Sequence, residues 1–166
     1  VQSPPSMLKL HDFCNRALAM SLHAVFAGIR PARLDMKRFW RDSVLCALAS
    51  RTITRRSGRP GLERMLVIGL LADIGHLVMF QTTPLLADAA RQSAVQTGEA
   101  LHLAERRIVG CDFAEVGAAL MDQWRVPGAF ARAIGTQTLP KLGGEHAGDA
   151  ATLNLAGPLL QARLGW

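Results

Sequence analysis

Tyrosine is absent from this sequence, and aromatic residues make up only 5% of it. Proteins that bind single-stranded nucleic acid stack bases on aromatic side chains, so this scarcity disfavours that class. The three cysteines, Cys14, Cys46 and Cys111, lie far apart and form no CxxC pair, which indicates buried thiols in a reducing compartment. The longest uncharged apolar stretch near the middle, residues 65–72, is far shorter than the roughly 20 residues that span a bilayer. We therefore expect a cytoplasmic protein without a membrane helix.

Signatures of common enzyme classes are also missing. The sequence contains no nucleophile elbow of the G-x-S-x-G type, no phosphate-binding P-loop and no Rossmann glycine pattern. No segment of five or more residues alternates apolar and polar residues as a half-buried strand does. The composition leans toward Ala and Leu, which favour helix over sheet. These features predict an all-α fold.

The length of 166 residues fits a single domain, residues 1–166. The chain begins VQSPP, without an initiator Met or a signal-peptide pattern, so we expect it to be a piece of a longer chain. The net charge is +6, from 19 Lys and Arg against 13 Asp and Glu. These basic residues are spread along the chain, with no cluster denser than residues 51–59. We therefore expect no nucleic-acid partner, and steeply salt-dependent binding to DNA or RNA would contradict this.

Helical spacing of apolar residues fills the segments between glycines and prolines. Two helix starts are well marked, because Pro84 follows Thr83 and because Asp112 and Glu115 form a capping box. The segment 62–80 is apolar on almost all sides, which is typical of a central helix. About eight helices are predicted, at residues 7–27, 36–57, 62–80, 84–98, 99–110, 113–124, from 127 onward, and 149–164 after a loop at 140–148.

Several short motifs occur in a fixed order along the chain. They are FWRDS at 39–43, GLLADIGHL at 69–77, Pro84, Glu105, Gly110 followed by FAEVGA at 113–118, WRVP at 124–127 and Ala133-Ile134. Together they resemble the HDOD family, a divergent branch of the HD-type phosphohydrolases found in bacterial signalling proteins. The resemblance covers residues 36–166 and is poor over residues 1–35, where the family's D-P-x-L and N-S signatures are not found. It implies an HD-like helical bundle.

In active HD enzymes, His and Asp side chains from several helices hold divalent metals that activate water for attack on a phosphate ester. The resemblance implies that Ala72 replaces the His of the His-Asp doublet, while Asp73 keeps its identity. The corresponding positions are Asp42, Ala72, Asp73, Phe113, Gln137, Thr138 and Gly157. Two carboxylates without a histidine make a poor transition-metal site. We therefore expect no catalytic residue, metal or other cofactor, and a former pocket that Ala72 and Phe113 make smaller and drier.

Asp73 lies inside a segment predicted to be a buried helix, so its charge needs a partner or a metal. One interpretation is a carboxylate held charged by an arginine or by backbone N–H groups, and the other is a relict ion site. Asp42 could repel Asp73 or share a proton with it, which would raise one pKa. Arg38 and Arg41 are candidates to neutralise the pair. His76 is interpreted as a partly exposed helix residue, with a ligand as the alternative.

The resemblance implies a regulatory role in bacterial signal transduction. The first hypothesis is a non-catalytic module that binds other signalling proteins or a covalently linked domain, such as a receiver or cyclic-di-GMP-related domain. The alternative is a metal-dependent phosphohydrolase or phosphodiesterase with an atypical site around Asp42 and Asp73. It predicts a divalent metal that stays bound through purification.

Overall fold

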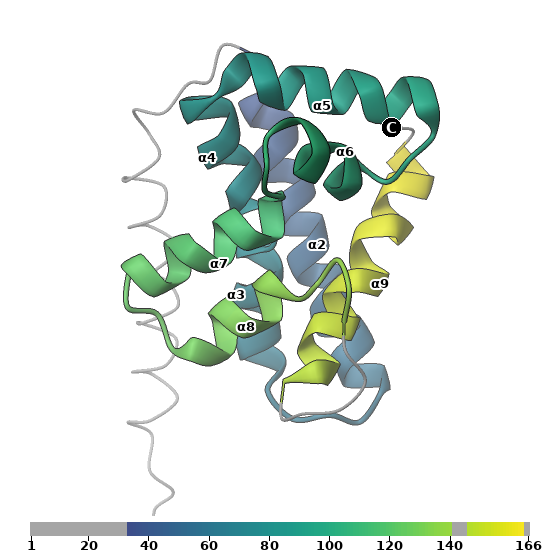
Figure 1. The fold of residues 1–166 in the computed structure, drawn as a ribbon. Coiled ribbons are helices and arrows are strands. Elements are labelled where there is room, and N and C mark those ends of the chain that lie inside the picture. Colours follow the sequence, from purple (N-terminus) through teal and green to yellow (C-terminus); the bar gives the residue numbers. More distant parts are fainter. Residues whose placement is uncertain (1–32, 141–145, 165–166) are drawn as a thin grey trace, which may run out of the picture. The chain divides into compact units, whose positions relative to one another are not determined.

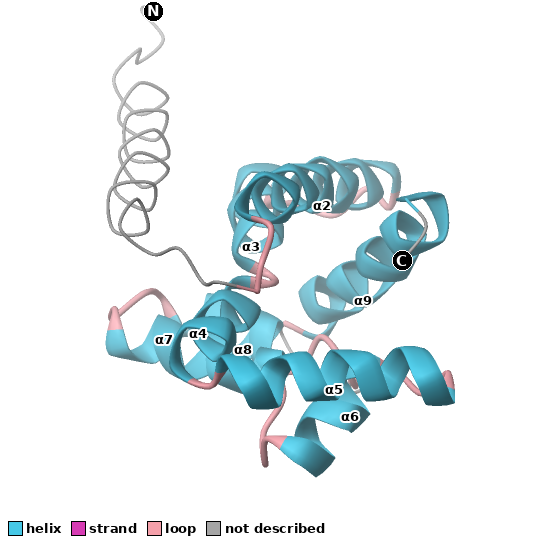
Figure 2. Cartoon of the chain, turned by 90° about the horizontal axis from the view of Figure 1, so that it is seen from above, coloured by secondary structure: helices cyan, strands magenta, loops and turns pink. Residues whose placement is uncertain are grey.

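The computed structural model describes the backbone of residues 33–140 and 146–164, with side chains as far as residue 159. Every regular element in these residues is a helix (Figure 2), which confirms the predicted all-α class. The predicted helix at 7–27 and the centre of the predicted loop at 140–148 lie outside the described residues. The helices are α2 (Met36–Arg56), α3 (Leu62–Leu71), α4 (Ile74–Thr82), α5 (Pro84–Thr97), α6 (Leu101–Ile108), α7 (Phe113–Gln123), α8 (Gly128–Gly135) and α9 (Ala147–Leu164).

The helix boundaries follow capping chemistry that the sequence displays. Asp112 and Glu115 form the predicted capping box at the start of α7, each side chain accepting a backbone N–H of the other. Pro84 occupies the first turn of α5, as predicted. The same helix ends at Gly98, whose φ of 72° lies in the left-handed region that favours glycine. Because these signals act within one turn, the boundaries of α5 and α7 could be predicted from the sequence.

The predicted helix at 62–80 is wrong in one respect, because it breaks into α3 and α4 at Ala72 and Asp73. Two glycines explain the break. A Cβ on Gly69 would lie 2.7 Å from the Cα of Ala47, and a Cβ on Gly75 would lie 1.9 Å from the carbonyl oxygen of Phe113. The first half therefore lies directly on α2 and the second directly on α7. One straight helix could not follow both neighbours.

The helices pack around the broken central pair. Helix α3 packs mainly on α2, α4 on α7, α5 on α6, and α9 on both α2 and α8 (Figure 1). The core contains large side chains that are almost fully buried, contributed by four of these helices. They are Met65, Ile68, Ile74, Leu77, Met121 and Ile134. The Ala72–Asp73 break therefore lies at the centre of the packed helices, where α3, α4 and α8 converge.

The segment Leu62–Thr82 has the length and hydropathy of a membrane span. The break at Ala72 and Asp73 divides this segment, and more than half of its most apolar part is buried inside the domain. Burial among other helices is the usual reason for such an apolar segment in a folded core. Its composition is therefore explained by its central place in the fold.

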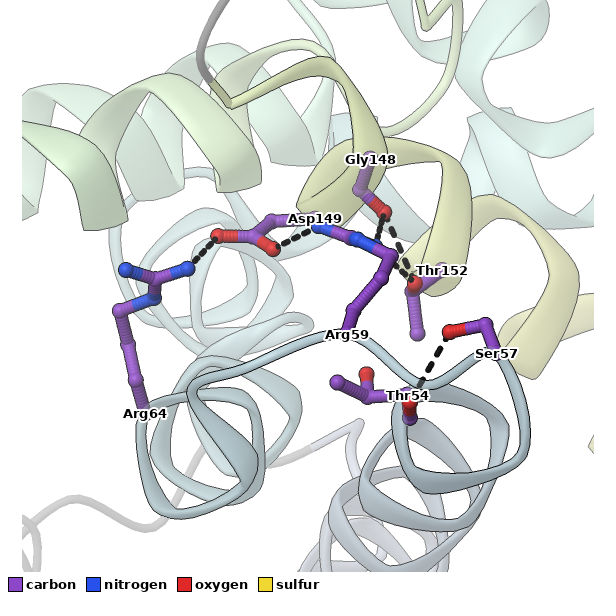
Figure 3. Close-up of polar contacts among 7 residues, drawn as sticks. All are labelled: Thr54, Ser57, Arg59, Arg64, Gly148, Asp149 and Thr152. Carbon is purple, nitrogen blue, oxygen red and sulfur yellow. Dashed lines mark hydrogen bonds and ion pairs between the residues drawn. The ribbon is translucent and has the colours of Figure 1, made fainter.

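Helix α9 is joined to the α2–α3 connection by a buried ion pair (Figure 3). The Asp149 carboxylate, which is 0% exposed, lies 2.6 Å from a guanidinium nitrogen of Arg59 and 2.9 Å from one of Arg64. Arg59 also donates to the carbonyl of Gly148, at 2.6 Å. These contacts fix the first turn of α9 to residues about 90 positions earlier in the chain.

Candidate functional site

The positions that the HDOD resemblance singled out lie on five different parts of the fold. The break between α3 and α4 is central to them, because it contains both residues that the resemblance assigns to the family's His-Asp doublet. Asp42 is on α2, Ala72 and Asp73 form the break, Phe113 begins α7, Gln137 and Thr138 follow α8, and Gly157 is on α9. The structure joins Gln137 directly to Ala72 and brings Asp42 close enough to influence Asp73.

Gln137 makes the best-defined contact of the site. Its side-chain amide donates to the carbonyl of Ala72 over 2.8 Å, and both residues are buried. The carbonyl of Gln137 in turn accepts a hydrogen bond from the side-chain amide of Asn154 on α9, over 2.7 Å. Gln137, which the resemblance places at a ligand-histidine position, therefore links the α3–α4 break to α9 through neutral hydrogen bonds.

Asp73 has different surroundings from those predicted. In the described part of the chain, no arginine and no backbone N–H pairs with its carboxyl group. Arg41 and Arg38 instead approach Asp42, at 3.0 and 3.7 Å. Burial raises the pKa of Asp73, the nearby His76 lowers it, and the charge of Asp42 raises it further. The predicted effect of Asp42 on that pKa is therefore confirmed. The prediction that Arg38 and Arg41 neutralise the pair is confirmed for Asp42, and the prediction of an arginine partner is wrong for Asp73.

His76 is built into a buried cluster. Its Nε2 lies 3.0 Å from a carboxylate oxygen of Glu105, and its ring stacks on that of Phe113 at 4.2 Å between centroids. The other carboxylate oxygen of Glu105 accepts the backbone N–H of Phe113 over 3.1 Å. Burial lowers the pKa of His76, but the Glu105 carboxylate, with Asp73 and Asp112, raises it more, so the net direction is upward. With 18% of its side chain exposed, His76 is a partly exposed helix residue, as predicted.

The cluster predicts a pH dependence of stability. Because the folded state raises the pKa of His76 above its ordinary value near 6.5, it holds the proton more tightly than the unfolded chain. The resulting stabilisation is complete below that ordinary value and is lost as pH rises through the folded value. Urea unfolding between about pH 6 and pH 9 should show a falling free energy of unfolding in the wild type and a flatter profile in His76→Gln. His102→Gln changes a histidine outside the cluster and is the control, and identical profiles for His76→Gln and wild type would contradict the prediction.

The donor set does not fit a divalent metal. Among residues 33–140 and 146–159, no group of three or more His, Cys, Asp or Glu side chains is arranged so that it could hold one. Asp42 is already engaged by two arginines, and Ala72 and Phe113 offer no ligand atom. The ring of Phe113 packs on His76, and a Cβ on Gly157 would meet no atom within 4 Å.

Sequence reasoning missed the roles of Glu105 and Asn154. Glu105 was noted only as part of a motif, yet it is 2% exposed and contacts two neighbouring helices. A signal was available, because Leu101, Ala104, Glu105 and Ile108 follow the spacing of one inward helix face. An acidic residue on such a face indicates a buried partner. The contact of Asn154 has no comparable local signal.

Comparison with protein families identifies the chain. The sequence model of the HDOD domain matches residues 7–140. The chain belongs to the HDOD family. The match begins within the segment where the resemblance noted above was poor. No protein of curated function matches the chain.

Solved structures share the fold of this HDOD chain. A proposed phosphohydrolase from Shewanella amazonensis SB2B has a TM-score of 0.75 and 26% identity, covering 90% of this chain and 54% of that one. A proposed signal-transduction protein from Marinobacter aquaeolei VT8 has a TM-score of 0.69 and 27% identity, covering 78% and 29%. An HDOD domain protein of unknown function from Geobacter sulfurreducens has a TM-score of 0.72 and 22% identity, covering 80% and 45%. The HDOD chain thus spans about half, or less, of the structures it matches.

Proposed function

We propose that this HDOD domain is a non-catalytic, cytoplasmic module of bacterial signal transduction that acts by binding other proteins. The observation that carries the proposal is the use of the former ligand positions. The side-chain amide of Gln137 donates a hydrogen bond to the Ala72 carbonyl, and Phe113 packs on His76. Side chains committed to internal contacts are not available to bind a metal and activate water.

The relatives agree with a signalling role. One is a proposed signal-transduction protein, and another is the response regulator MmoQ from Methylococcus capsulatus, with a TM-score of 0.65 and 26% identity. Both are longer than this chain, which covers 29% and 53% of them. A covalently linked domain, such as a receiver or a cyclic-di-GMP-related domain, is therefore one proposed partner, and separate signalling proteins are the other.

The alternative function is metal-dependent phosphoester hydrolysis around Asp42 and Asp73. In its support, the charge of Asp42 raises the pKa of Asp73, and a proposed phosphohydrolase shares the fold. Against it stands the engagement of Asp42 by Arg38 and Arg41. A cationic neighbour at that distance competes with a metal for the same carboxylate.

The two functions predict different results in one experiment. The purified protein should contain no stoichiometric divalent metal by elemental analysis, and it should not hydrolyse phosphodiesters or nucleotides when Mn²⁺ or Mg²⁺ is added. Asp73→Ala should leave any background rate unchanged. Asp122→Ala, on the exposed end of α7, is the matched control. A turnover that Asp73→Ala abolishes and Asp122→Ala preserves would overturn the non-catalytic proposal.

A further inference from the structure

The break between α3 and α4 leaves one buried carbonyl without its helical partner. In a continuous helix the N–H of His76 would donate to the carbonyl of Ala72, four residues earlier. Here that N–H donates to the carbonyl of Asp73 instead, over 3.0 Å. Ala72 is only 1% exposed, so water has little access to the freed oxygen. A buried carbonyl without a partner would destabilise the domain.

The partner of this carbonyl comes from far along the chain. Gln137 is 6% exposed and donates its side-chain amide to Ala72 across 65 residues of sequence. The carbonyl of Gln137, just past the end of α8, accepts the amide of Asn154 on α9. A continuous line of hydrogen bonds therefore runs from α9 past α8 to the α3–α4 break. We refer to Asn154, Gln137 and the Ala72 carbonyl as the amide bridge.

We propose that the amide bridge replaces metal coordination as the tie between these helices, so that the folded domain is independent of divalent metal. In proteins that bind a metal through several helices, coordination contributes to the free energy of folding. In this chain the helix break lies at the two positions that the resemblance assigns to the doublet, and the described residues contain no group of three or more side chains that could hold a metal. The side-chain amide of Gln137, a neutral group, donates a hydrogen bond to the Ala72 carbonyl at that break. The inference concerns how the domain is held together and does not depend on which partner it binds.

The test must distinguish the stability that comes from the Gln137 hydrogen bond from the stability that comes from the volume of its side chain. Gln137→Met keeps most of the volume but removes the amide, leaving the Ala72 carbonyl buried and unpaired. We expect its melting temperature to fall by roughly 4–12 °C, which corresponds to the penalty for one unpaired buried carbonyl in a domain of this size. Gln123→Ala, on the exposed end of α7, is the matched control and should change the melting temperature by less than about 2 °C. A Gln137→Met protein as stable as the wild type would overturn the proposal.

A milder variant keeps the test informative should Gln137→Met fail to fold. Asn154→Leu removes only the outer hydrogen bond of the bridge at a half-buried position. Amide hydrogen exchange should then accelerate around residues 72–76, relative to the amides of α5. Where both variants fold, the double variant should lose less stability than the sum of the two single losses, because both substitutions act on one line of hydrogen bonds. Unchanged exchange at the break in Asn154→Leu would show that the bridge does not hold it.

The metal arm of the experiment compares the wild-type melting temperature in EDTA, in Mn²⁺ and in Zn²⁺. The bridge predicts equal values in EDTA and Mn²⁺, and no upward shift in Zn²⁺. A fall of several degrees in EDTA would overturn the proposal, because it would reveal a stabilising metal. This outcome is distinct from the test of function. Turnover would refute the non-catalytic role, whereas a neutral Gln137→Met variant would refute the bridge alone.

Discussion

Gly75→Ala is expected to destabilise the domain by about 3–5 kcal/mol, enough to lower the melting temperature by roughly 10–20 °C or to prevent folding. The new Cβ would lie 1.9 Å from the carbonyl oxygen of Phe113 and 2.9 Å from the backbone nitrogen of Gly117. These are backbone atoms, which cannot rotate away as a flexible side chain can. Helix α4 would have to move off α7, opening the packing between the two. Circular dichroism during thermal and urea unfolding measures the loss.

Gly157→Ala is the matched control for this prediction. Gly157 is also a helical glycine without a left-handed φ, but a Cβ there would meet no atom within 4 Å. Alanine there restricts the unfolded chain, which favours folding by about 0.5–1 kcal/mol, whereas the following Pro158 disfavours helical backbone for a residue with a Cβ. The net change should therefore stay within about 1 kcal/mol in either direction. A Gly75→Ala protein with wild-type stability would show that α4 does not approach α7 so closely in solution.

The contrast between these glycines shows what a sequence can and cannot reveal about this fold. The boundaries of α5 and α7 were predictable, because Pro84 and the Asp112–Glu115 capping box act within one turn. The break at Ala72 and Asp73 was not predictable, because apolar residues continue without interruption on both sides of it. It results from close contacts with two helices, one earlier and one later in the chain.

The same division applies to the candidate site. The resemblance to HDOD proteins indicated which positions to examine, and the identities of Ala72 and Phe113 predicted the loss of metal ligands. The contacts made at these positions could not be predicted, since the hydrogen bond from Gln137 to Ala72 spans 65 residues. Nothing in the local sequence says whether a glutamine after a helix points into the core or into water.

Buried carboxylates form an intermediate case, because the spacing of apolar residues does carry a signal for them. Asp149 shares its helix face with three other buried residues of α9, Thr152, Leu153 and Ala156, at spacings of three, four and seven. Asp149 on this inward face indicates a buried partner, although the sequence does not say which one. The structure supplies two, Arg59 from the connection between α2 and α3, and Arg64 from the first turn of α3.

Asp149→Ala is expected to lower the free energy of unfolding by about 2–4 kcal/mol. Removing one partner of a buried ion pair costs roughly 3–5 kcal/mol, but Arg59 and Arg64 are 32% and 38% exposed and can regain some water. The loss should therefore fall somewhat below that range. Urea unfolding with a linear extrapolation measures it.

The exposed pair between Arg51 and Glu63 provides the control for this last prediction. Its nitrogen and oxygen are 3.0 Å apart, similar to the contacts of Asp149, but the side chains are 46% and 42% exposed. Surface pairs of this kind contribute about 0–1 kcal/mol, so Glu63→Ala should have little effect. Equal losses of stability for Glu63→Ala and Asp149→Ala would mean that burial adds nothing to the stability contributed by the ion pair in Figure 3. A loss confined to Asp149→Ala would show that this ion pair holds the first turn of α9 to Arg59, which lies 90 residues earlier in the sequence.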